Sequence, residues 1–326
     1  MSARPRFLAV TGPTASGKTD LSLALAERAR VEVISMDSRQ VYREVDIGTD
    51  KVGRQARAAV PHHGLDLVDL DERYSAGRFA RDARRWIAEI EGRRALPLLV
   101  GGTGFFLRAV TEPMFAEPPL DADRLESLRA WLGGQPRERL ELWARRLDPE
   151  RADLAAEGGP QRLGRTLEVA LLSGRPLTWW HREAPAEEGG LPGVVVVLDL
   201  PREEMDRHIE DRVSVMVERG LVDEVRRVLD AGYTEAAPGF TGTGYREIAA
   251  HLRGEATLEE AVEQIRASTR RYARRQLTWF RNQLPGAVRL DAMLPVQEQA
   301  DAALAAFERA GGRVPWSEVV ENEVGM

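Results

Sequence analysis

The chain has 326 residues, of which 43% are hydrophobic and 30% charged, so it can bury a sizeable core and is neither disordered nor collagenous. It contains no cysteine, which excludes disulfides, thiol catalysis and zinc ribbons. No apolar run approaches the ~20 residues of a membrane span. We therefore expect a soluble, cytoplasmic protein of about two domains without a membrane segment.

The formal net charge of −6 argues, as an average, against a protein that binds nucleic acid. Averages hide local clusters, so the distribution of charge matters. Of the 46 Lys and Arg residues, only Lys18 and Lys51 are lysines. A GC-rich genome explains most of this bias, but a retained lysine stands out because a planar guanidinium cannot always replace a compact ammonium.

Strand and helix patterns alternate over the first hundred residues. Residues 6–12 read as a short buried strand, followed by a glycine-rich loop and an apolar-periodic helix over 21–29. Further strand patterns end at Asp37 and Gly101, with a helix over 75–90 between them. The alternation predicts an α/β fold with a parallel sheet flanked by helices, in which ligands bind beyond the C-terminal ends of the strands.

A helical segment interrupts this pattern. Residues 123–180 show only helical patterns rich in Arg, Glu, Leu and Ala, preceded by two prolines at 118–119. The strand pattern resumes near Val194. We therefore expect an all-helical insertion domain at 118–190 and a core formed by 1–117 and 191–326, whose later part is again mostly helical.

Residues 12–19, GPTASGKT, fit the phosphate-binding pattern G-x-x-x-x-G-K-[ST] between a strand and a helix. The glycines let backbone N–H groups turn inward around an anion, Lys18 adds a mobile charge, and the Thr19 hydroxyl can bind magnesium. The alternative is a glycine-rich turn without a ligand. The motif indicates a polyphosphate without specifying a nucleotide. The residues expected to bind it are Gly12, Pro13, Thr14, Ala15, Ser16, Gly17, Lys18 and Thr19.

Asp37 directly follows the second strand pattern, where its carboxylate would project over the phosphate site. Such a carboxylate could bind magnesium, orient an attacking group or act as a general base. A helix cap or turn cap is the structural alternative. Residues 101–104, GGTG, form another tight turn, which lets the backbone approach a ligand but is often merely a turn.

Residues 266–281 contain six arginines and no acid. At about 100° per residue, a helix places Arg266, Arg270, Arg274 and Arg281 on one face and apolar side chains on the opposite face. A solvated arginine face is the ordinary explanation. An uncompensated stripe in an acidic protein favours contact with the phosphate backbone of a nucleic acid.

Two weaker patterns have structural explanations. His62 and His63 are adjacent rather than spaced like metal ligands, which favours structural loop histidines. Residues 194–199, VVVVLD, resemble the strand and Asp of the second NTPase motif, although a buried strand explains them equally well.

Several segments of the sequence, taken together in chain order, resemble the bacterial tRNA dimethylallyltransferases. The resemblance rests on residues 12–19, 36–42, 47–51, 61–63 and 100–104, and it continues through 161–174, 212–225, 244–247 and 269–281. A series of this length is far more specific than a single loop. It implies a core like that of the P-loop NTPases, which bind nucleotides such as ATP, with the helical insertion gripping the anticodon arm of tRNA.

This family transfers a dimethylallyl group from its diphosphate to the N6 amine of the adenosine directly 3′ of the anticodon, in tRNAs that read codons beginning with U. The resemblance implies that the phosphate loop, with magnesium bound at Thr19, holds the diphosphate leaving group. It implies catalytic roles for three residues: Asp37 as the proton acceptor, Thr103 beside the reacting base and Arg212 on the diphosphate.

We further expect the target adenosine to be flipped out of the anticodon loop, and the protein to act as a monomer. The resemblance implies that tRNA is bound by Asp37, Ser38, Arg39, Gln40, Gln161, Arg162, Leu163, Gly164, Arg165, Gly242, Thr243, Gly244, Tyr245, Arg246 and Glu247. The arginine stripe adds Arg270, Arg274 and Arg281 to the residues expected to bind tRNA. Two other classes stay open. A P-loop small-molecule kinase or ATPase predicts phosphate release from ATP without RNA, and an RNA-binding protein without catalysis predicts that Asp37 is dispensable.

Overall fold

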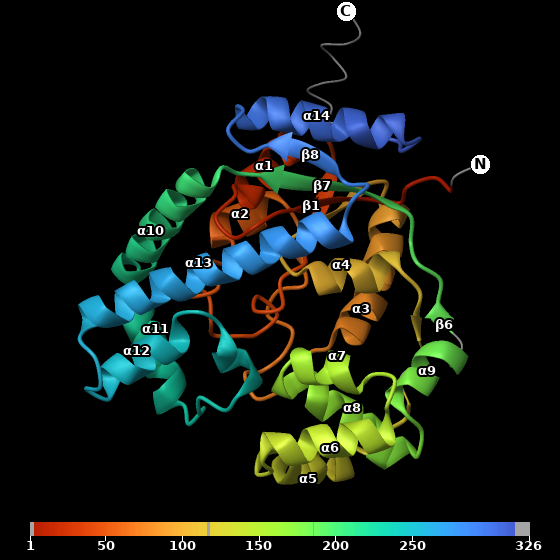
Figure 1. Ribbon diagram of the computed structural model, residues 1–326. Coiled ribbons are helices and arrows are strands. Elements are labelled where there is room, and N and C mark those ends of the chain that lie inside the picture. The colour runs from red at the N-terminus through yellow and green to blue at the C-terminus, as the bar shows by residue number, and fades with distance from the viewer. Residues whose placement is uncertain (1–2, 116–117, 185, 317–326) are drawn as a thin grey trace, which may run out of the picture. The chain divides into compact units, whose positions relative to one another are not determined.

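The computed structural model describes residues 3–115, 118–184 and 186–316. Its internal contacts divide the chain into two compact units. One unit consists of Met1–Glu112 and Leu191–Met326, and the other of Pro113–Gly190 (Figure 1). The second unit interrupts the first in sequence.

The first unit is built on a six-stranded sheet with the order β3-β2-β4-β1-β7-β8, in which all neighbouring strands are parallel. Every residue of β1 and β2 is buried, as expected for a parallel sheet covered on both faces. The strands are β1 (Phe7–Thr11), β2 (Val31–Ser35), β3 (His62–His63), β4 (Leu96–Val100), β7 (Gly193–Asp199) and β8 (Val288–Asp291).

Helices cover both faces of this sheet (Figure 1). On one face, α1 (Lys18–Arg28) and α14 (Val296–Arg309) form an apolar cluster with side chains of β1, β2, β4 and β7. On the other face lie α3 (Ala76–Gly92) and α4 (Gly104–Thr111), where Phe79 and Phe106 stack with ring centroids 4.3 Å apart. The α/β fold predicted from the sequence is confirmed.

The first unit contains further helices outside these two groups. The long helix α13 (Leu258–Gln283) starts at a capping box, in which the Glu260 N–H donates to the Thr257 hydroxyl and the Thr257 N–H donates to the Glu260 carboxylate. The others are α2 (Arg54–Ala59), α10 (Arg202–Glu218), α11 (Leu221–Asp230), the 3₁₀ helix η1 (Pro238–Thr241) and α12 (Tyr245–Leu252).

The second unit is mainly helical, with a small apolar core of its own that includes Leu132, Leu140, Leu163 and Leu167. It also holds one short antiparallel ladder, formed by β5 (Met114–Phe115) and β6 (Ala186–Glu188), so the expected all-helical insertion needs this addition. Strands this short leave no periodic pattern in the sequence. Its helices are α5 (Ala122–Gly133), α6 (Arg137–Leu147), α7 (Ala152–Glu157), α8 (Pro160–Ser173) and α9 (Leu177–Glu183).

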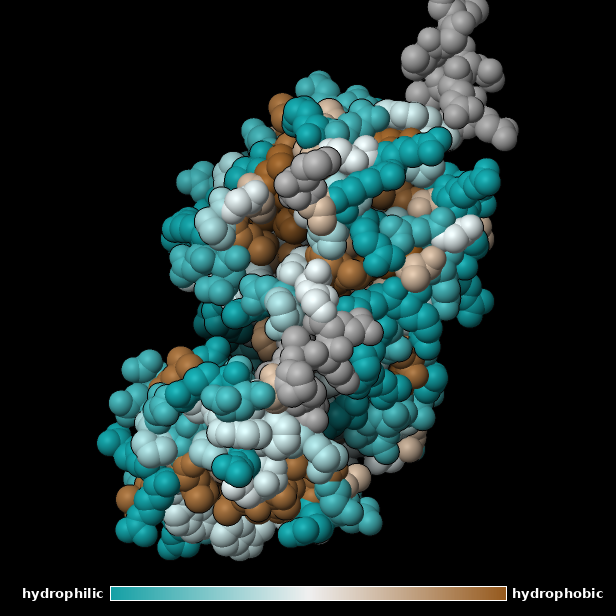
Figure 2. Space-filling view, turned by 90° about the vertical axis from the view of Figure 1, so that its right-hand side faces the viewer, coloured by the Kyte–Doolittle hydropathy of each residue, from teal (hydrophilic) through white to brown (hydrophobic). Residues whose placement is uncertain are grey.

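The face of the molecule in Figure 2 is mostly hydrophilic, and hydrophobic residues gather on it in separate patches. Among the helices of the described residues, none combines the length and the apolar character needed to cross a bilayer.

Candidate active site

The phosphate loop joins the C-terminal end of β1 to the start of α1. Two of its residues have a left-handed backbone conformation, with a φ of +81° at Gly17 and of +63° at Ala15. The Ser16 hydroxyl is buried and has no hydrogen-bond partner in the described structure. A buried donor without a partner beside a helix N-terminus is suited to an anionic ligand.

Lys18, the first residue of α1, folds back over this loop. Its ammonium donates to the backbone oxygens of Gly12 (3.2 Å) and Pro13 (2.6 Å). Burial, followed by repulsion from Arg212, lowers the pKa of Lys18 to about 8. Lys18 therefore remains mainly protonated at neutral pH and can attract a diphosphate.

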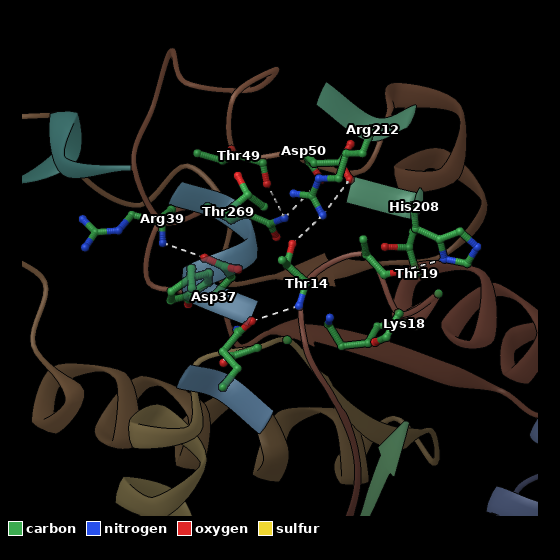
Figure 3. A pocket seen from close by; sticks show the side chains of 18 of the residues that line it. Thr14, Lys18, Thr19, Asp37, Arg39, Thr49, Asp50, His208, Arg212 and Thr269 are labelled. Atoms are coloured by element: carbon green, nitrogen blue, oxygen red, sulfur yellow. Dashed lines mark hydrogen bonds and ion pairs between the residues drawn. The ribbon is translucent and has the colours of Figure 1, made fainter. Parts of the chain in front are cut away.

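A cavity of about 910 Å³ opens over the loop. It is lined by the ends of β2 and β4, by the turn at residues 48–52, and by α10 and α13. Figure 3 shows side chains of both charges around it. The charged residues that line it include Lys18, Asp37, Arg39, Asp50, Arg212 and Arg275.

Arg212 reaches this cavity from α10 and contacts the phosphate loop directly (Figure 3). Its guanidinium donates to the Thr14 hydroxyl at 2.9 Å, and an ion pair of 3.5 Å joins it to Asp50. The structure thus brings Arg212 and the loop together, as the resemblance implies. A guanidinium and an ammonium that both contact the loop make a strongly anion-binding pocket.

Asp37 lines the same cavity, at the end of β2. One carboxylate oxygen accepts the backbone N–H of Arg39 at 2.8 Å, as in an Asx turn, while the second oxygen has no hydrogen bond in the part of the chain described. The turn-cap and proton-acceptor interpretations are therefore compatible. Thr103 is not among the cavity-lining residues, and its hydroxyl accepts the Ser38 N–H at 3.0 Å, so it steadies the backbone next to Asp37.

Gln276 of α13 is a site residue that the sequence analysis did not single out. Its side-chain oxygen accepts the Thr14 N–H (2.9 Å) and its amide donates to the Gly102 oxygen (2.8 Å). Gln276 therefore ties the phosphate loop to the 101–104 turn. It lies on the same helical face as Thr269 and Tyr272, which also line the cavity, and that spacing was the available signal.

The residues expected to bind tRNA near Asp37 are held by internal contacts. Arg39 donates to the Pro238 oxygen (3.0 Å) and the Thr241 hydroxyl (2.6 Å), which draws η1 to the cavity. Gln40 donates to the backbone oxygens of Thr49 and Asp50. Besides Asp37, the expected tRNA-binding residues that line the cavity are Ser38, Arg39, Gln40, Gly242 and Thr243.

Residues 244–247 start α12 and differ among themselves in exposure. Tyr245 is fully buried and donates its hydroxyl to Glu224 at 2.8 Å, so its side chain supports the core instead of lying on an RNA-binding surface. Glu247 accepts the Gly244 N–H at 3.0 Å and caps the helix. Arg246 is exposed. The sequence pattern does not distinguish these positions, because their burial depends on tertiary packing.

The expected tRNA-binding residues of the second unit lie at the start of α8. Gln161 and Arg162 are exposed, Gly164 and Arg165 are partly buried, and Leu163 is buried in the apolar core. Leu163 thus contributes packing, and the exposed polar positions are the ones available to a ligand.

The arginine stripe of α13 is largely compensated, contrary to the interpretation drawn from the sequence. Arg270 pairs with Glu210 (3.0 Å) and Glu263 (2.8 Å), and Arg274 lies 3.8 Å from Asp206. Acids of α10 supply most of these partners, and they are distant in sequence. The arginines of α13 without an ion pair in the described structure are Arg271, Arg275 and Arg281, all of them exposed.

The other candidate motifs have structural roles, although His62 and His63 form the short strand β3 and do not lie in a loop as the sequence suggested. His63 contacts the Glu32 carboxylate (2.9 Å), and His62 contacts the Val60 oxygen (2.7 Å). No cluster of three or more His, Asp or Glu side chains that could hold a metal occurs among the described residues. Asp199 pairs with Arg289 (3.2 Å) and does not line the cavity, which removes support for a second NTPase motif at 194–199.

Comparison with known proteins identifies the family of this chain. A family model described as IPP transferase matches residues 40–283, and another described as isopentenyl transferase matches residues 5–73. The chain belongs to the IPP transferase family. It is 41% identical over 278 residues to a tRNA dimethylallyltransferase of Geobacter metallireducens, covering 85% of this chain and 90% of that relative. A tRNA dimethylallyltransferase of Thermomicrobium roseum is 43% identical over 289 residues, covering 86% and 85%.

Solved structures show the same fold. A tRNA isopentenylpyrophosphate transferase from Bacillus halodurans superposes with a TM-score of 0.67 at 33% identity, covering 94% of this chain and 97% of that one. A eukaryotic dimethylallyltransferase described as acting on tRNA gives a TM-score of 0.79 at 24% identity, covering 96% and 81%, which is a likeness of fold.

Proposed function

We propose that this member of the IPP transferase family is a tRNA dimethylallyltransferase, which transfers a dimethylallyl group to the N6 amine of the adenosine directly 3′ of the anticodon in tRNAs that read codons beginning with U. One observation carries the proposal. A phosphate loop clamped by Arg212 and a carboxylate with an unused oxygen, Asp37, line a single cavity of about 910 Å³. This arrangement provides for a leaving diphosphate and for a proton-losing nucleophile in the same space.

The diphosphate of the donor would lie in the phosphate loop. Backbone N–H groups of the loop, the Lys18 ammonium and the Arg212 guanidinium would stabilise the charge that develops on the leaving oxygens as the bond from the allylic carbon to oxygen breaks. Preorganised donors of this kind are worth several kcal/mol in a transition state. Gln276 holds the loop in place by accepting the Thr14 N–H.

Magnesium fits this loop through Thr19. The Thr19 side chain is exposed at the start of α1, and its hydroxyl makes no hydrogen bond within the described structure. Since no cluster of three acids is present among the described residues, the ion would take most of its ligands from the diphosphate and water, as magnesium commonly does. When bound, it would supply charge neutralisation on the diphosphate.

The adenine amine would attack the allylic carbon from the Asp37 side of the cavity. One bond from carbon to nitrogen forms, the bond from carbon to oxygen breaks, and the amine proton moves to the free oxygen of Asp37. The Thr103 hydroxyl accepts the Ser38 N–H and would thereby hold the backbone next to Asp37 in place. A positioned general base of this kind contributes about a hundredfold to ten-thousandfold.

A stacked base cannot present its amine inside a cavity, so we propose that the adenosine is flipped out of the anticodon loop. Cavity-lining residues of the 38–40 and 242–243 segments would contact the flipped nucleotide and its neighbours. The exposed arginines of α13 would bind phosphates, and the unit at Pro113–Gly190 would grip the anticodon arm through exposed residues such as Gln161 and Arg162. We also propose that the protein works as a monomer, since the cavity is built within one chain. Its proposed place of action is the cytoplasm.

The direct test incubates the protein with radiolabelled dimethylallyl diphosphate and magnesium. The acceptors are two unmodified transcripts of one tRNA, with adenosine or guanosine at the target position. Label is expected in the adenosine transcript alone. Absence of label from that transcript, or release of phosphate from ATP without RNA, would overturn the proposal in favour of a P-loop kinase or ATPase.

A further inference from the structure

Glu224 is a buried carboxylate next to the cavity but outside it. It lies in the first turn of α11 and is 2% exposed. Its Oε2 accepts the N–H groups of Asp46 (2.8 Å) and Ile47 (2.7 Å), while Oε1 accepts the Gly48 N–H (3.0 Å) and the Tyr245 hydroxyl (2.8 Å). No lysine or arginine pairs with it in the structure as described, so these hydrogen bonds alone compensate its burial.

The three N–H groups belong to a tight turn over residues 46–51. Within it the Asp50 N–H donates to the Ile47 oxygen (3.0 Å) and the Lys51 N–H donates to the Asp46 oxygen (2.9 Å). Asp50 has a φ of +52°, in the left-handed region that Asp adopts more readily than most other side chains. Glu224 anchors the first half of the turn, while Gln40 donates to the backbone oxygens of Thr49 and Asp50 in the second half, so both carboxylate and amide set the place of Asp50.

Tyr245 packs the turn from the same side. A Cβ at Gly48 would lie 2.6 Å from the Tyr245 ring, so the backbone of the turn rests directly on this buried aromatic side chain. The Tyr245 hydroxyl is in turn directed at Glu224. Glycine at position 48 is required by this close approach.

Asp50 connects the turn to the diphosphate clamp, as Figure 3 shows. Its carboxylate lies 3.5 Å from Arg212 and 3.7 Å from Arg219. Arg212 in turn donates to the Thr14 hydroxyl in the phosphate loop. A continuous set of contacts thus runs from Glu224 through the turn and Asp50 to the guanidinium over the loop.

We propose that Glu224 is a positioning residue for the diphosphate site, which acts by holding the 46–51 turn so that Asp50 orients Arg212. The inference rests on the proposed function, since it takes the loop ligand to be a diphosphate. Glu224 does not line the cavity, so it would act through the turn instead of through the ligand. Glutamine at this position would keep the shape of the side chain but would offer one acceptor oxygen to the four donors that the two carboxylate oxygens now serve. The turn would then loosen, and Arg212 would lose its fixed orientation.

The test measures binding of inorganic pyrophosphate with magnesium by calorimetry, which needs neither tRNA nor turnover. Glu224→Gln is expected to weaken binding about tenfold, a loss equivalent to one or two hydrogen bonds. In an Arg212→Gln background the same change is expected to have no further effect, because the two residues act in one chain of contacts. Equal weakening in both backgrounds would contradict the inference.

Glu32→Gln is the matched control, because Glu32 is also a buried carboxylate, is 7% exposed and lies away from the cavity. It is expected to bind pyrophosphate like the unchanged protein. Gly48→Ala disturbs the same turn with Glu224 intact and is expected to reproduce the tenfold loss, which keeps the inference testable if Glu224→Gln does not fold. Normal binding by Gly48→Ala or Glu224→Gln would overturn the inference. Failure of the unchanged protein to bind pyrophosphate would overturn the proposed function instead.

Discussion

Arg212 of α10 donates a hydrogen bond of 2.9 Å to the hydroxyl of Thr14, which lies 198 residues earlier in the phosphate loop. The contact joins two segments that the 113–190 unit separates in sequence. It makes the anion pocket a composite of the N-terminal strand-loop-helix and a later helix. Under the proposed function, this composite pocket would stabilise a whole diphosphate as the leaving group.

Arg212→Ala should lower kcat/KM for dimethylallyl diphosphate by about a hundredfold to a thousandfold, the range seen when one preorganised donor to a developing anion is lost. Steady-state kinetics with saturating tRNA provide the measurement. Arg212→Lys keeps the charge but loses the planar fork and should recover only part of the activity. Full activity in Arg212→Ala would show that this side chain does not act on the leaving group.

Asp37→Asn should lower kcat by about a hundredfold to ten-thousandfold with little change in the KM for the donor, because the amide cannot take the amine proton. Asp199→Asn is the matched control. Asp199 also ends a strand of the parallel sheet, but it pairs with Arg289 and does not line the cavity, so kcat should stay within about twofold. If both variants lose activity equally, Asp37 has no special role.

Arg271→Gln and Arg275→Gln should each weaken tRNA binding and reduce the slope of log K against log salt by about one. These arginines are exposed and have no ion pair in the described part of the chain. Arg270→Gln should leave the salt dependence nearly unchanged, because Arg270 already pairs with Glu210 and Glu263. Filter binding across a salt series distinguishes the two sets, and equal slopes for all three variants would rule out the assignment.

Thr19→Val should raise the magnesium concentration required for half-maximal transfer by about tenfold, since a methyl group replaces the hydroxyl ligand. Thr19→Ser, which retains the hydroxyl, should require nearly the same concentration as the unchanged protein. Chelation by EDTA should abolish transfer reversibly. A magnesium requirement that is identical in Thr19→Val would place the ion elsewhere.

Glu32 gives a prediction about stability and pH. Hydrogen bonds, mainly from Arg93, hold the pKa of Glu32 below its ordinary value of 4.5. The folded state therefore binds fewer protons than the unfolded state in this range, and the pair stabilises the fold above about pH 4.5 and ceases to do so as pH falls. The difference in thermal midpoint between the unchanged protein and Glu32→Gln should be largest near pH 6 to 7 and shrink below pH 4.5. A difference that is constant with pH would contradict this.

The local parts of the fold and site could be predicted from sequence. The phosphate loop has a fixed spacing, and Asp37 follows a buried strand, so the order of residues alone places both at the C-terminal edge of the sheet. The short strand β8 was not predicted, because Val288–Asp291 contains an arginine and spans too few residues to show a period.

Contacts between distant segments could not be predicted in this way. The acids that neutralise Arg270 and Arg274 lie mainly on α10, and only the packing of α10 against α13 brings them together. The burial of Tyr245 against Glu224 depends equally on tertiary packing. One sequence reveals which residues are charged or apolar, but it does not reveal which of them compensate one another.

We propose that the phosphate loop holds a diphosphate that leaves from carbon. The decisive experiment uses dimethylallyl diphosphate that carries oxygen-18 in the bridge between the allylic carbon and phosphorus, reacted with unmodified tRNA and analysed by mass spectrometry. The heavy oxygen is expected to leave entirely in the released pyrophosphate, and N6-dimethylallyladenosine is expected to form without it. Heavy oxygen retained on the prenyl fragment, or a phosphorylated product, would mean that the bond broken is at phosphorus and would overturn the proposed role of the loop.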